Sequence, residues 1–300
     1  MPNSSRHTIP AESLTIVIPA RDEAPHIGRL VAEIRGRFPE AEIVVVDDGS
    51  ADETGTLAAG AGASVLRHPY PLGNGAAVRR GIRASRREWV LLMDGDGQHR
   101  PDEIGRLLDG AEEYVLTVGA RNYQGQTALR AFGNRIFNLL ATYVSGVPVR
   151  DLTSGMRLYR RRAVATLLPL FPNGFSSPAT GTLGILRSGL PVRFVPVQTG
   201  PGERPSHLNP WAEGVRFLMI IFRIATLYSP LKVFLPLASL LFFGGGLYLG
   251  WSLMRHQTFP PAALFTLTSA VLILGLGMLS EQISQLRFSR ALETGDEEIR

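Results

Sequence analysis

Two long stretches without formal charge near the C-terminus limit most strongly what this chain can fold into. Residues 233–254 and 256–280 contain no Asp, Glu, Lys or Arg. The first rises roughly 33 Å as a helix, which is enough for a bilayer core of about 30 Å. We therefore expect two transmembrane helices within residues 233–284, joined by a short turn at Pro260 and Pro261. Buried core helices of a soluble protein are the alternative, but such helices seldom run so long without a charge.

The charges around these stretches predict how the helical hairpin is oriented. Arg216, Arg223 and Lys232 precede the hairpin, whereas Arg255 lies between its two stretches. Loops rich in Lys and Arg tend to stay in the cytoplasm. We therefore expect both ends of the hairpin, and the domain before it, on the cytoplasmic side.

The segments at the margins have simpler predicted roles. Residues 211–232 are rich in Phe, Leu, Ile and Met and carry two Arg near one helix face. This pattern favours an amphipathic helix in the membrane interface over a plain packing helix. Residues 285–300 are expected to form a cytoplasmic tail. Residues 1–12 contain no apolar run, so we expect a flexible tail and not a signal peptide.

Residues 13–210 show the alternation typical of an α/β domain. Apolar runs that suit buried strands alternate with segments of helical spacing. Strands are expected at residues 14–18, 42–46, 64–66, 89–93 and 114–118, and helices at residues 24–38, 52–59, 73–85 and 101–110. This order predicts βαβ units and a mainly parallel sheet.

Composition excludes several kinds of chemistry. The 300 residues include 31 Lys and Arg, 26 Asp and Glu, and no cysteine. Without cysteine there is no disulfide, no thiolate metal site and no cysteine nucleophile. No Gly-rich loop ending in Gly-Lys-Ser/Thr is present, which disfavours P-loop phosphoryl transfer. No nucleic-acid partner is expected.

Three acidic clusters each follow a predicted strand. They are Glu23, the pair Asp47 and Asp48, and the pair Asp94 and Asp96. Ligands of an open parallel sheet bind beyond the carboxyl ends of its strands, so we expect the three clusters to share one site. Any one cluster taken alone is more often a turn and helix cap, but three clusters at successive strand ends are hard to explain as turns.

Two short segments suggest that the site binds a metal ion and an anion. Asp94 and Asp96, separated by Gly95 alone, can reach one Mg²⁺ or Mn²⁺ ion, and Gly95 lets a ligand approach the backbone closely. The segment from Gly73 to Gly81 opens a predicted helix, so its N–H groups could face an anion.

A series of motifs follows in a fixed order. The motifs are Pro-Ala-Arg-Asp-Glu, Val-Val-Asp-Asp-Gly-Ser, Gly-Asn-Gly-Ala-Ala-Val, Met-Asp-Gly-Asp-Gly-Gln-His-Arg-Pro, Val-Gly-Ala-Arg and Asp-Leu-Thr-Ser-Gly-Met-Arg. In this order they resemble family 2 glycosyltransferases, and more narrowly the dolichol-phosphate mannosyltransferase and polyprenyl-phosphate glycosyltransferase group. The resemblance covers residues 14–210, and a two-helix C-terminal hairpin recurs in many members. It implies a GT-A fold, which is a Rossmann-like α/β domain that binds a nucleotide sugar.

The resemblance also implies roles for individual residues. The positions that bind the donor are matched by Pro19, Arg21, Glu23, Asp47, Asp48, Asp94 and Gly95. The positions that bind the metal, Mg²⁺ or Mn²⁺, are matched by Asp94, Asp96 and Gln98. The catalytic positions beside the sugar and the acceptor phosphate are matched by Arg121, Asp151 and Arg157. Solvated surface arginines, and a turn cap for Asp151, are the alternatives.

The chain departs from the family pattern at two places. Gly174 and Phe175 lead into a helix that has no acidic residue where the family often has one, so no catalytic carboxylate comes from that helix. The family also often has Arg-x-Gly-Lys-Ser-Lys before the membrane region. The corresponding stretch here leaves Arg204 and His207 as the candidates for binding the acceptor phosphate.

The acceptor can be argued from acid–base chemistry. A phosphate monoester, with a second pKa of ~6, is anionic at neutral pH, whereas a hydroxyl needs a general base. We therefore expect a membrane-anchored inverting glycosyltransferase that moves a sugar from a nucleotide-diphosphate sugar, of the GDP-mannose or UDP-glucose type, to a polyprenyl phosphate. Transfer to a glycolipid or diacylglycerol hydroxyl, and a non-catalytic membrane scaffold, are the alternatives. The hairpin also allows a homo-oligomer formed through the transmembrane helices.

Overall fold

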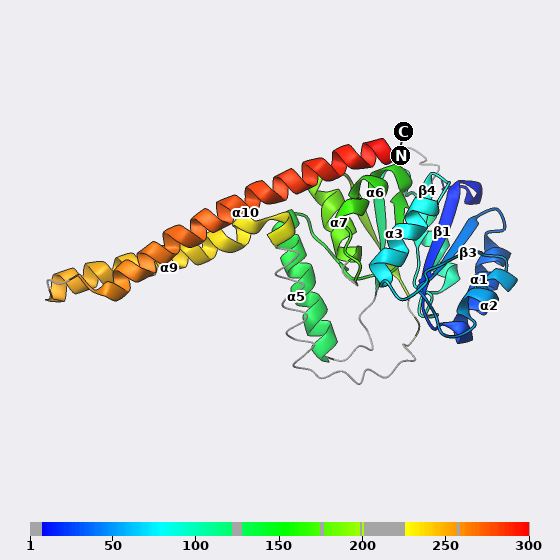
Figure 1. Cartoon of the computed structure of the whole chain (residues 1–300), viewed down its shortest axis with the longest axis horizontal. Coiled ribbons are helices and arrows are strands. Elements are labelled where there is room, and N and C mark those ends of the chain that lie inside the picture. Colours follow the sequence, from blue (N-terminus) through cyan, green and yellow to red (C-terminus); the bar gives the residue numbers. More distant parts are fainter. Residues whose placement is uncertain are drawn as a thin grey trace, which may run out of the picture. The chain divides into compact units, whose positions relative to one another are not determined.

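The computed structural model describes residues 8–121, 128–174, 177–198, 200, 226–256 and 259–299. The chain divides into two compact units, one formed by residues 1–212 with 291–300 and the other by residues 213–290. The first unit contains a seven-stranded sheet with helices around it, and the second contains two long helices (Figure 1).

The sheet confirms the prediction of mainly parallel strands. Its strand order is β3-β2-β1-β4-β6-β5-β7. The strands are β1 Leu14–Ala20, β2 Glu42–Asp47, β3 Ser64–Arg67, β4 Trp89–Leu92, β5 Leu116–Arg121, β6 Arg157–Arg160 and β7 Val192–Val197. Strand β6 runs antiparallel to its neighbours β4 and β5, and the other pairs are parallel.

The helices of this unit follow the predicted order as far as residue 108 and then add elements that were not predicted. They are η1 Ala11–Ser13, α1 Ala24–Arg37, α2 Thr54–Gly60, α3 Asn74–Ala84, η2 Pro101–Glu103, α4 Ile104–Leu108, α5 Ala128–Ser145, α6 Arg161–Leu167, η3 Leu168–Leu170 and α7 Ser177–Arg187. Helices α5 and α6 and strands β6 and β7 were not predicted, whereas α7 is the helix that the resemblance implies after Gly174 and Phe175.

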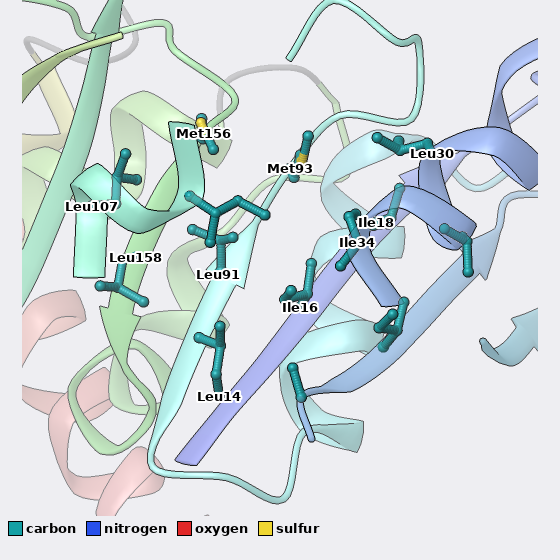
Figure 2. Packing of buried hydrophobic residues seen from close by; sticks show 14 of the residues in the cluster. Leu14, Ile16, Ile18, Leu30, Ile34, Leu91, Met93, Leu107, Met156 and Leu158 are labelled. Atoms are coloured by element: carbon teal, nitrogen blue, oxygen red, sulfur yellow. The ribbon is translucent and has the colours of Figure 1, made fainter. Parts of the chain in front are cut away.

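The core lies between the sheet and helices α1 and α4. Ile16 and Ile18 of β1, Leu91 of β4 and Leu158 of β6 are fully buried, and they pack with Ile34 of α1 (Figure 2). Each such side chain contributes roughly 1.5–3 kcal/mol through burial of apolar surface. The core therefore fixes the strand ends from which the candidate site residues project.

The N-terminal end of the described chain is more ordered than the predicted flexible tail. Ile9 is buried in the core cluster. Thr8 forms an isolated antiparallel bridge with Asp109, and the backbone N–H of Ile9 donates to the carbonyl of Leu108. The predicted boundary at residue 13 is therefore wrong for residues 8–12, because one apolar side chain suffices to dock this segment.

Helix α3 packs so closely on the sheet that Gly81 tolerates no side chain. A Cβ atom on Gly81 would lie 2.2 Å from Cγ1 of Val17 and 3.2 Å from Cγ2 of Val46. We expect Gly81→Ala to lower the free energy of unfolding by about 1–3 kcal/mol, because overpacking outweighs the better helix propensity of Ala. Urea unfolding followed by circular dichroism measures this change.

A matched glycine on α1 serves as the control. A Cβ atom on Gly36 would have nothing within 4 Å, so Gly36→Ala should raise the free energy of unfolding by up to about 1 kcal/mol. Equal changes in the free energy of unfolding for Gly81→Ala and Gly36→Ala would contradict the close packing of α3 on β1 and β2.

The second unit is a hairpin of two apolar helices, α9 Pro230–His256 and α10 Pro261–Ile299. Residues Pro230–Arg255 and Pro261–Arg290 are long and apolar enough to cross a membrane, and their mean hydropathies are 1.8 and 2.1. Large apolar side chains such as Leu247 and Phe265 are exposed along the helices, as expected for surfaces that face lipid.

Small residues and one carboxylate hold the two helices of the hairpin together. A Cβ atom on Gly277 would lie 2.7 Å from Cβ of Phe234, so glycine permits the close approach there. One helical turn away, Oε2 of Glu281 accepts a hydrogen bond from the backbone N–H of Leu231, at 3.3 Å. Glu281 thus satisfies a donor in the first turn of α9, a turn that lacks carbonyl partners within its own helix.

The boundaries around the hairpin differ from the predicted ones. Helix α10 continues to Ile299, past the predicted start of a tail at residue 285. Most of the predicted interfacial helix at 211–232 falls within residues 201–225, which lie outside the described residues.

Candidate active site

The predicted site segments lie along one edge of the sheet. Strands β1, β2, β4 and β5 run in parallel and end at this edge, and β6 begins there because it runs in the opposite direction. The edge includes the point between β1 and β4 where the strand order reverses, which is where open α/β sheets bind ligands. The fold therefore brings together clusters that are far apart in the sequence.

Asp47 and Asp48 are buried at the end of β2. Oδ1 of Asp48 accepts hydrogen bonds from Nδ1 of His68 at 2.7 Å and from the backbone N–H of Leu72 at 2.8 Å, and its Oδ2 accepts from the N–H of Gly73 at 2.8 Å. Desolvation raises the pKa of Asp48, but His68 and the two amides outweigh it and leave the pKa below its usual value. Asp48 thus holds the loop before α3, and its contact with the donor stays a prediction.

Asp47 has a similar internal role. Its Oδ1 accepts a hydrogen bond from the backbone N–H of Ser50 at 2.8 Å. Its Oδ2 has no hydrogen-bond partner among the described residues and lies 3.5 Å from Nε of Arg67. The Arg67 side chain is largely exposed, so it brings a positive charge to this end of the edge.

The segment after β1 interlocks with the loop after β2. Asp22 adopts a left-handed backbone with φ of 54°, which is uncommon outside glycine and is often found at functional sites. Its backbone N–H donates to Oγ of Ser50, and its Oδ1 accepts from the N–H of Ala51. Of the predicted donor-binding residues here, Glu23 is buried and Arg21 is exposed. Arg21 is therefore the one best placed to reach a ligand.

The glycines at the start of α3 do not form the suggested anion site. The backbone N–H of Gly75 donates to the carbonyl of Asn173 at 2.9 Å. A Cβ atom on Gly75 would lie 1.9 Å from the carbonyl oxygen of Pro172, and one on Gly73 would lie 2.4 Å from that of Asn173. These glycines are needed because the backbone of residues 172–174 crosses directly over them.

Asp94 and Asp96 follow β4 and are both half-buried. Oδ1 of Asp96 accepts from the backbone N–H of Gln98 at 3.0 Å. Oδ2 of Asp94 lies 3.7 Å from Nε2 of the buried His99. A Cβ atom on Gly95 would lie 3.2 Å from Cβ of Ala20 in β1, and a contact of the Gly95 backbone with the donor stays a prediction. The glycine makes room for β1.

Positive side chains surround the Asp94 carboxylate. Desolvation raises the pKa of Asp94, but His99 and the charges of Arg121 and Arg157 outweigh it and leave the pKa below its usual value. The carboxylate is therefore ionised at neutral pH, as a ligand for a hard cation must be.

The donor set at this place fits a divalent cation that is bound together with a diphosphate. Three His, Asp or Glu side chains that could share one ion are not found among the described residues. Protein-bound Mg²⁺ usually keeps several waters and takes one or two carboxylates plus substrate phosphates. Asp94 and Asp96 supply two carboxylates, and the role of Gln98 as a third ligand stays a prediction.

Arg121 and Asp151 form the strongest ion pair described at this edge. Nε of Arg121 donates to Oδ2 of the fully buried Asp151 at 2.9 Å, and its Nη2 donates to Oδ1 at 3.1 Å. The backbone N–H of Arg121 also donates to Oδ2, at 3.0 Å, and Thr153 binds both partners. Desolvation raises the pKa of Asp151, but Arg121 outweighs it and the net pKa is lowered. Asp151 therefore fixes Arg121 and is not poised to act as a base.

Arg157 is neither a surface arginine nor a side chain that reaches into the open site. Its side chain is fully buried at the start of β6. Its guanidinium donates to the carbonyls of Ser154 and Leu152 and to Oγ1 of Thr182. The structure does not support the predicted catalytic place of Arg157 beside the sugar and the acceptor phosphate, because its donors face the protein interior.

Three residues of this edge were not identified from the sequence. His68 and His99 each lie beside a predicted carboxylate, and Thr182 of α7 binds Arg157. His99 lies within the motif that follows β4, and His68 directly follows β3. Their positions after strand ends are the sequence signal that could have identified them. The predicted acceptor-phosphate residues, Arg204 and His207, lie outside the described residues.

Both units of the chain are similar to known protein families. The chain matches the family model described as "Glycosyl transferase family 2" over residues 15–168, and the model described as "GtrB C-terminal hairpin" over residues 229–286. The two matches fall on the sheet unit and on the helical hairpin.

Two curated relatives and one solved structure illustrate the similarity. The undecaprenyl-phosphate 4-deoxy-4-formamido-L-arabinose transferase of Pseudomonas paraeruginosa is 27% identical and aligns with 92% of this chain and 86% of its own. The polyprenol monophosphomannose synthase of Mycolicibacterium smegmatis is 30% identical over 63% of this chain and 77% of its own. The crystal structure of glucosyl-3-phosphoglycerate synthase from Mycobacterium tuberculosis with Mn²⁺, uridine diphosphate and glucosyl-3-phosphoglycerate is 20% identical, with a TM-score of 0.57 over 74% of this chain and 80% of its own.

Proposed function

This chain belongs to glycosyl transferase family 2, and we propose that it is a membrane-anchored enzyme that moves a sugar from a nucleotide-diphosphate sugar to a polyprenyl phosphate. The predicted GT-A fold is confirmed by the structural similarity. Two relatives are named for sugar transfer to polyprenol or undecaprenyl phosphate. The match to a membrane hairpin supports placing the acceptor in a lipid.

One observation carries the proposal. At a single edge of the sheet, the carboxylate of Asp94 adjoins a loop, residues 151–157, that is held by two arginines. A bound divalent cation would neutralise the diphosphate of the donor and the charge that develops as it leaves. The neighbouring Arg121 would attract an anionic acceptor to the same place, since guanidinium groups bind phosphate well.

The acid–base state of the site favours a phosphate acceptor over a hydroxyl acceptor. Asp151 is engaged by Arg121 and has a lowered pKa, so it is a poor proton acceptor. A hydroxyl nucleophile needs such a base, whereas a phosphate monoester is already anionic. One displacement by the lipid phosphate would invert the configuration at the sugar.

Further details of the proposal come from the sequence. We place the catalytic domain in the cytoplasm, because Arg216, Arg223 and Lys232 precede the first membrane span. We take the metal to be Mg²⁺ or Mn²⁺, since either suits a set of carboxylate and phosphate oxygens. A GDP-mannose or UDP-glucose type donor, and an oligomer formed through the hairpin, stay predictions.

A transfer assay tests the proposal. Membranes that contain the full chain are incubated with radiolabelled UDP- and GDP-sugars and Mg²⁺ or Mn²⁺, and label is counted in organic-extractable lipid. We expect label in lipid when polyprenyl phosphate is added and none when the matching polyprenol replaces it. Equal labelling with polyprenol, or with diacylglycerol, would establish the hydroxyl acceptor instead. No labelling with any donor, despite donor binding, would favour the non-catalytic scaffold.

A further inference from the structure

The buried Arg157 ties a loop of the candidate site to helix α7. Its Nε donates to the carbonyl of Ser154 at 2.6 Å, its Nη2 donates to the carbonyl of Leu152 at 2.7 Å, and its Nη1 donates to Thr182. Arginine is rarely buried without a partner, and no described carboxylate forms an ion pair with this one. Its hydrogen bonds therefore serve to fix the backbone of residues 152–155.

The same loop ends against the carboxylate that would bind the metal. A Cβ atom on Gly155 would lie 1.9 Å from Oδ2 of Asp94 and 2.5 Å from its Cγ. The Asp94 carboxylate therefore lies directly against the α-carbon of Gly155, with His99 at 3.7 Å from the same oxygen. Any shift of this backbone must change the orientation of Asp94.

We propose that Arg157 is a positioning residue that orients Asp94 toward the metal and the donor diphosphate through the backbone of residues 152–155. The inference rests on the proposed function of this site. Arg157 would then touch neither the acceptor nor the donor. Its removal would weaken metal binding, because partners that orient metal ligands typically change metal affinity by about 10- to 100-fold.

Lysine cannot replace Arg157 in this role. A single ammonium lacks the planar fork that reaches Ser154, Leu152 and Thr182 in three directions. We expect Arg157→Lys to weaken Mn²⁺ binding by about 10- to 100-fold although the positive charge is kept. The measurement is the electron paramagnetic resonance signal of free Mn²⁺, titrated into the full chain in detergent with UDP or, separately, with GDP.

A gentler variant and its control allow the same measurement if Arg157→Lys does not fold. Thr182→Val removes one hydrogen bond of Arg157 with little change of shape, and it should weaken Mn²⁺ binding in the same direction but less. Thr117→Val is the matched control, because Thr117 is equally buried but its hydroxyl has no hydrogen-bond partner among the described residues. The Mn²⁺ affinity of Thr117→Val should equal that of the wild type.

A third variant tests whether the effect passes through the loop. Gly155→Ala should displace Asp94 directly and weaken Mn²⁺ binding. In the Gly155→Ala background, Arg157→Lys should weaken Mn²⁺ binding little further, since both substitutions act on the contact between Gly155 and Asp94. Equal effects of Arg157→Lys in the wild-type and Gly155→Ala backgrounds would overturn the proposed route.

The results separate this inference from the proposed function. Wild-type Mn²⁺ affinity in folded Arg157→Lys, together with a raised KM for the lipid phosphate, would overturn the inference and assign Arg157 to the acceptor. A wild-type protein that binds no Mn²⁺ with either nucleotide and transfers no sugar would overturn the proposed function as well. Weaker Mn²⁺ binding with an unchanged KM for the lipid phosphate supports the inference.

Discussion

Asp94→Asn is expected to lower the rate of sugar transfer by about 10³-fold while the protein stays folded. The substitution removes one of two carboxylates that would bind a divalent cation, and a metal ion stabilises the leaving charge by several kcal/mol. Asp94 lies at a strand end outside the core, but its lowered pKa means that its charge is stabilised in the fold, so the free energy of unfolding should fall modestly. Turnover at saturating donor, measured by transfer of label to polyprenyl phosphate, gives the effect.

Asp102→Asn is the matched control for this prediction. Asp102 lies eight positions further along the same segment and pairs with Arg100 and Arg37 at the surface, where ion pairs contribute little. Its variant should transfer sugar at the wild-type rate. Transfer that survives both Asp94→Asn and excess chelator would show that this site works without a metal.

Arg121→Met is expected to lower the free energy of unfolding by about 3–5 kcal/mol at pH 7. The change leaves the fully buried Asp151 with an uncompensated charge, and breaking a buried pair from one side has about this effect. Urea unfolding in detergent measures the loss. Asp151→Leu in the same chain should restore part of the stability, because it removes the stranded charge.

The pH dependence of the same variant follows from the lowered pKa of Asp151. Its folded-state pKa lies below the unfolded value of ~3.9. The ion pair therefore stabilises the wild type fully above about pH 5, and this contribution is lost as the pH falls through the folded pKa. The stability gap between the wild type and Arg121→Met should be widest at neutral to alkaline pH and should narrow as the pH falls, from the point where the stranded Asp151 of the variant takes up a proton. If the difference in the free energy of unfolding between the wild type and Arg121→Met widened in acid, the ion pair would not be stabilising.

The first half of the fold was predictable because its signals are local. Ile16 and Ile18, or Val44 and Val45, lie in apolar runs that end at turn residues, and they are buried in β1 and β2 as expected. Strand β6 has no such run, since it is four residues long and has arginine at both ends. Its place between β4 and β5 depends on pairing with strands more than 35 residues away, which no local pattern records.

The candidate site was predictable in its location but not in the direction of its side chains. Strand-end carboxylates such as Asp94 were identified because parallel strands end at one edge. The sequence predicted Arg157 either at a catalytic position or on the surface, and no local pattern records its burial against Thr182, a residue of the later helix α7. The role of Gly75 was equally hidden, because the carbonyl that requires it belongs to Pro172, about a hundred residues later.

The ion pair between Arg121 and Asp151 also joins the two ends of the chain between them, whose helix α5 contacts α7 and whose Asn138 binds the backbone of Leu152. This excursion leaves the sheet at the end of β5 and returns just before β6, at the same edge. The ion pair closes its base between Arg121 at the end of β5 and Asp151 in the loop before β6. Chimeras that take residues 122–150 from a relative with a different lipid should therefore keep the donor end of the site intact. Exchanging the segment between Arg121 and Asp151 is a direct way to find which part of the chain selects the acceptor.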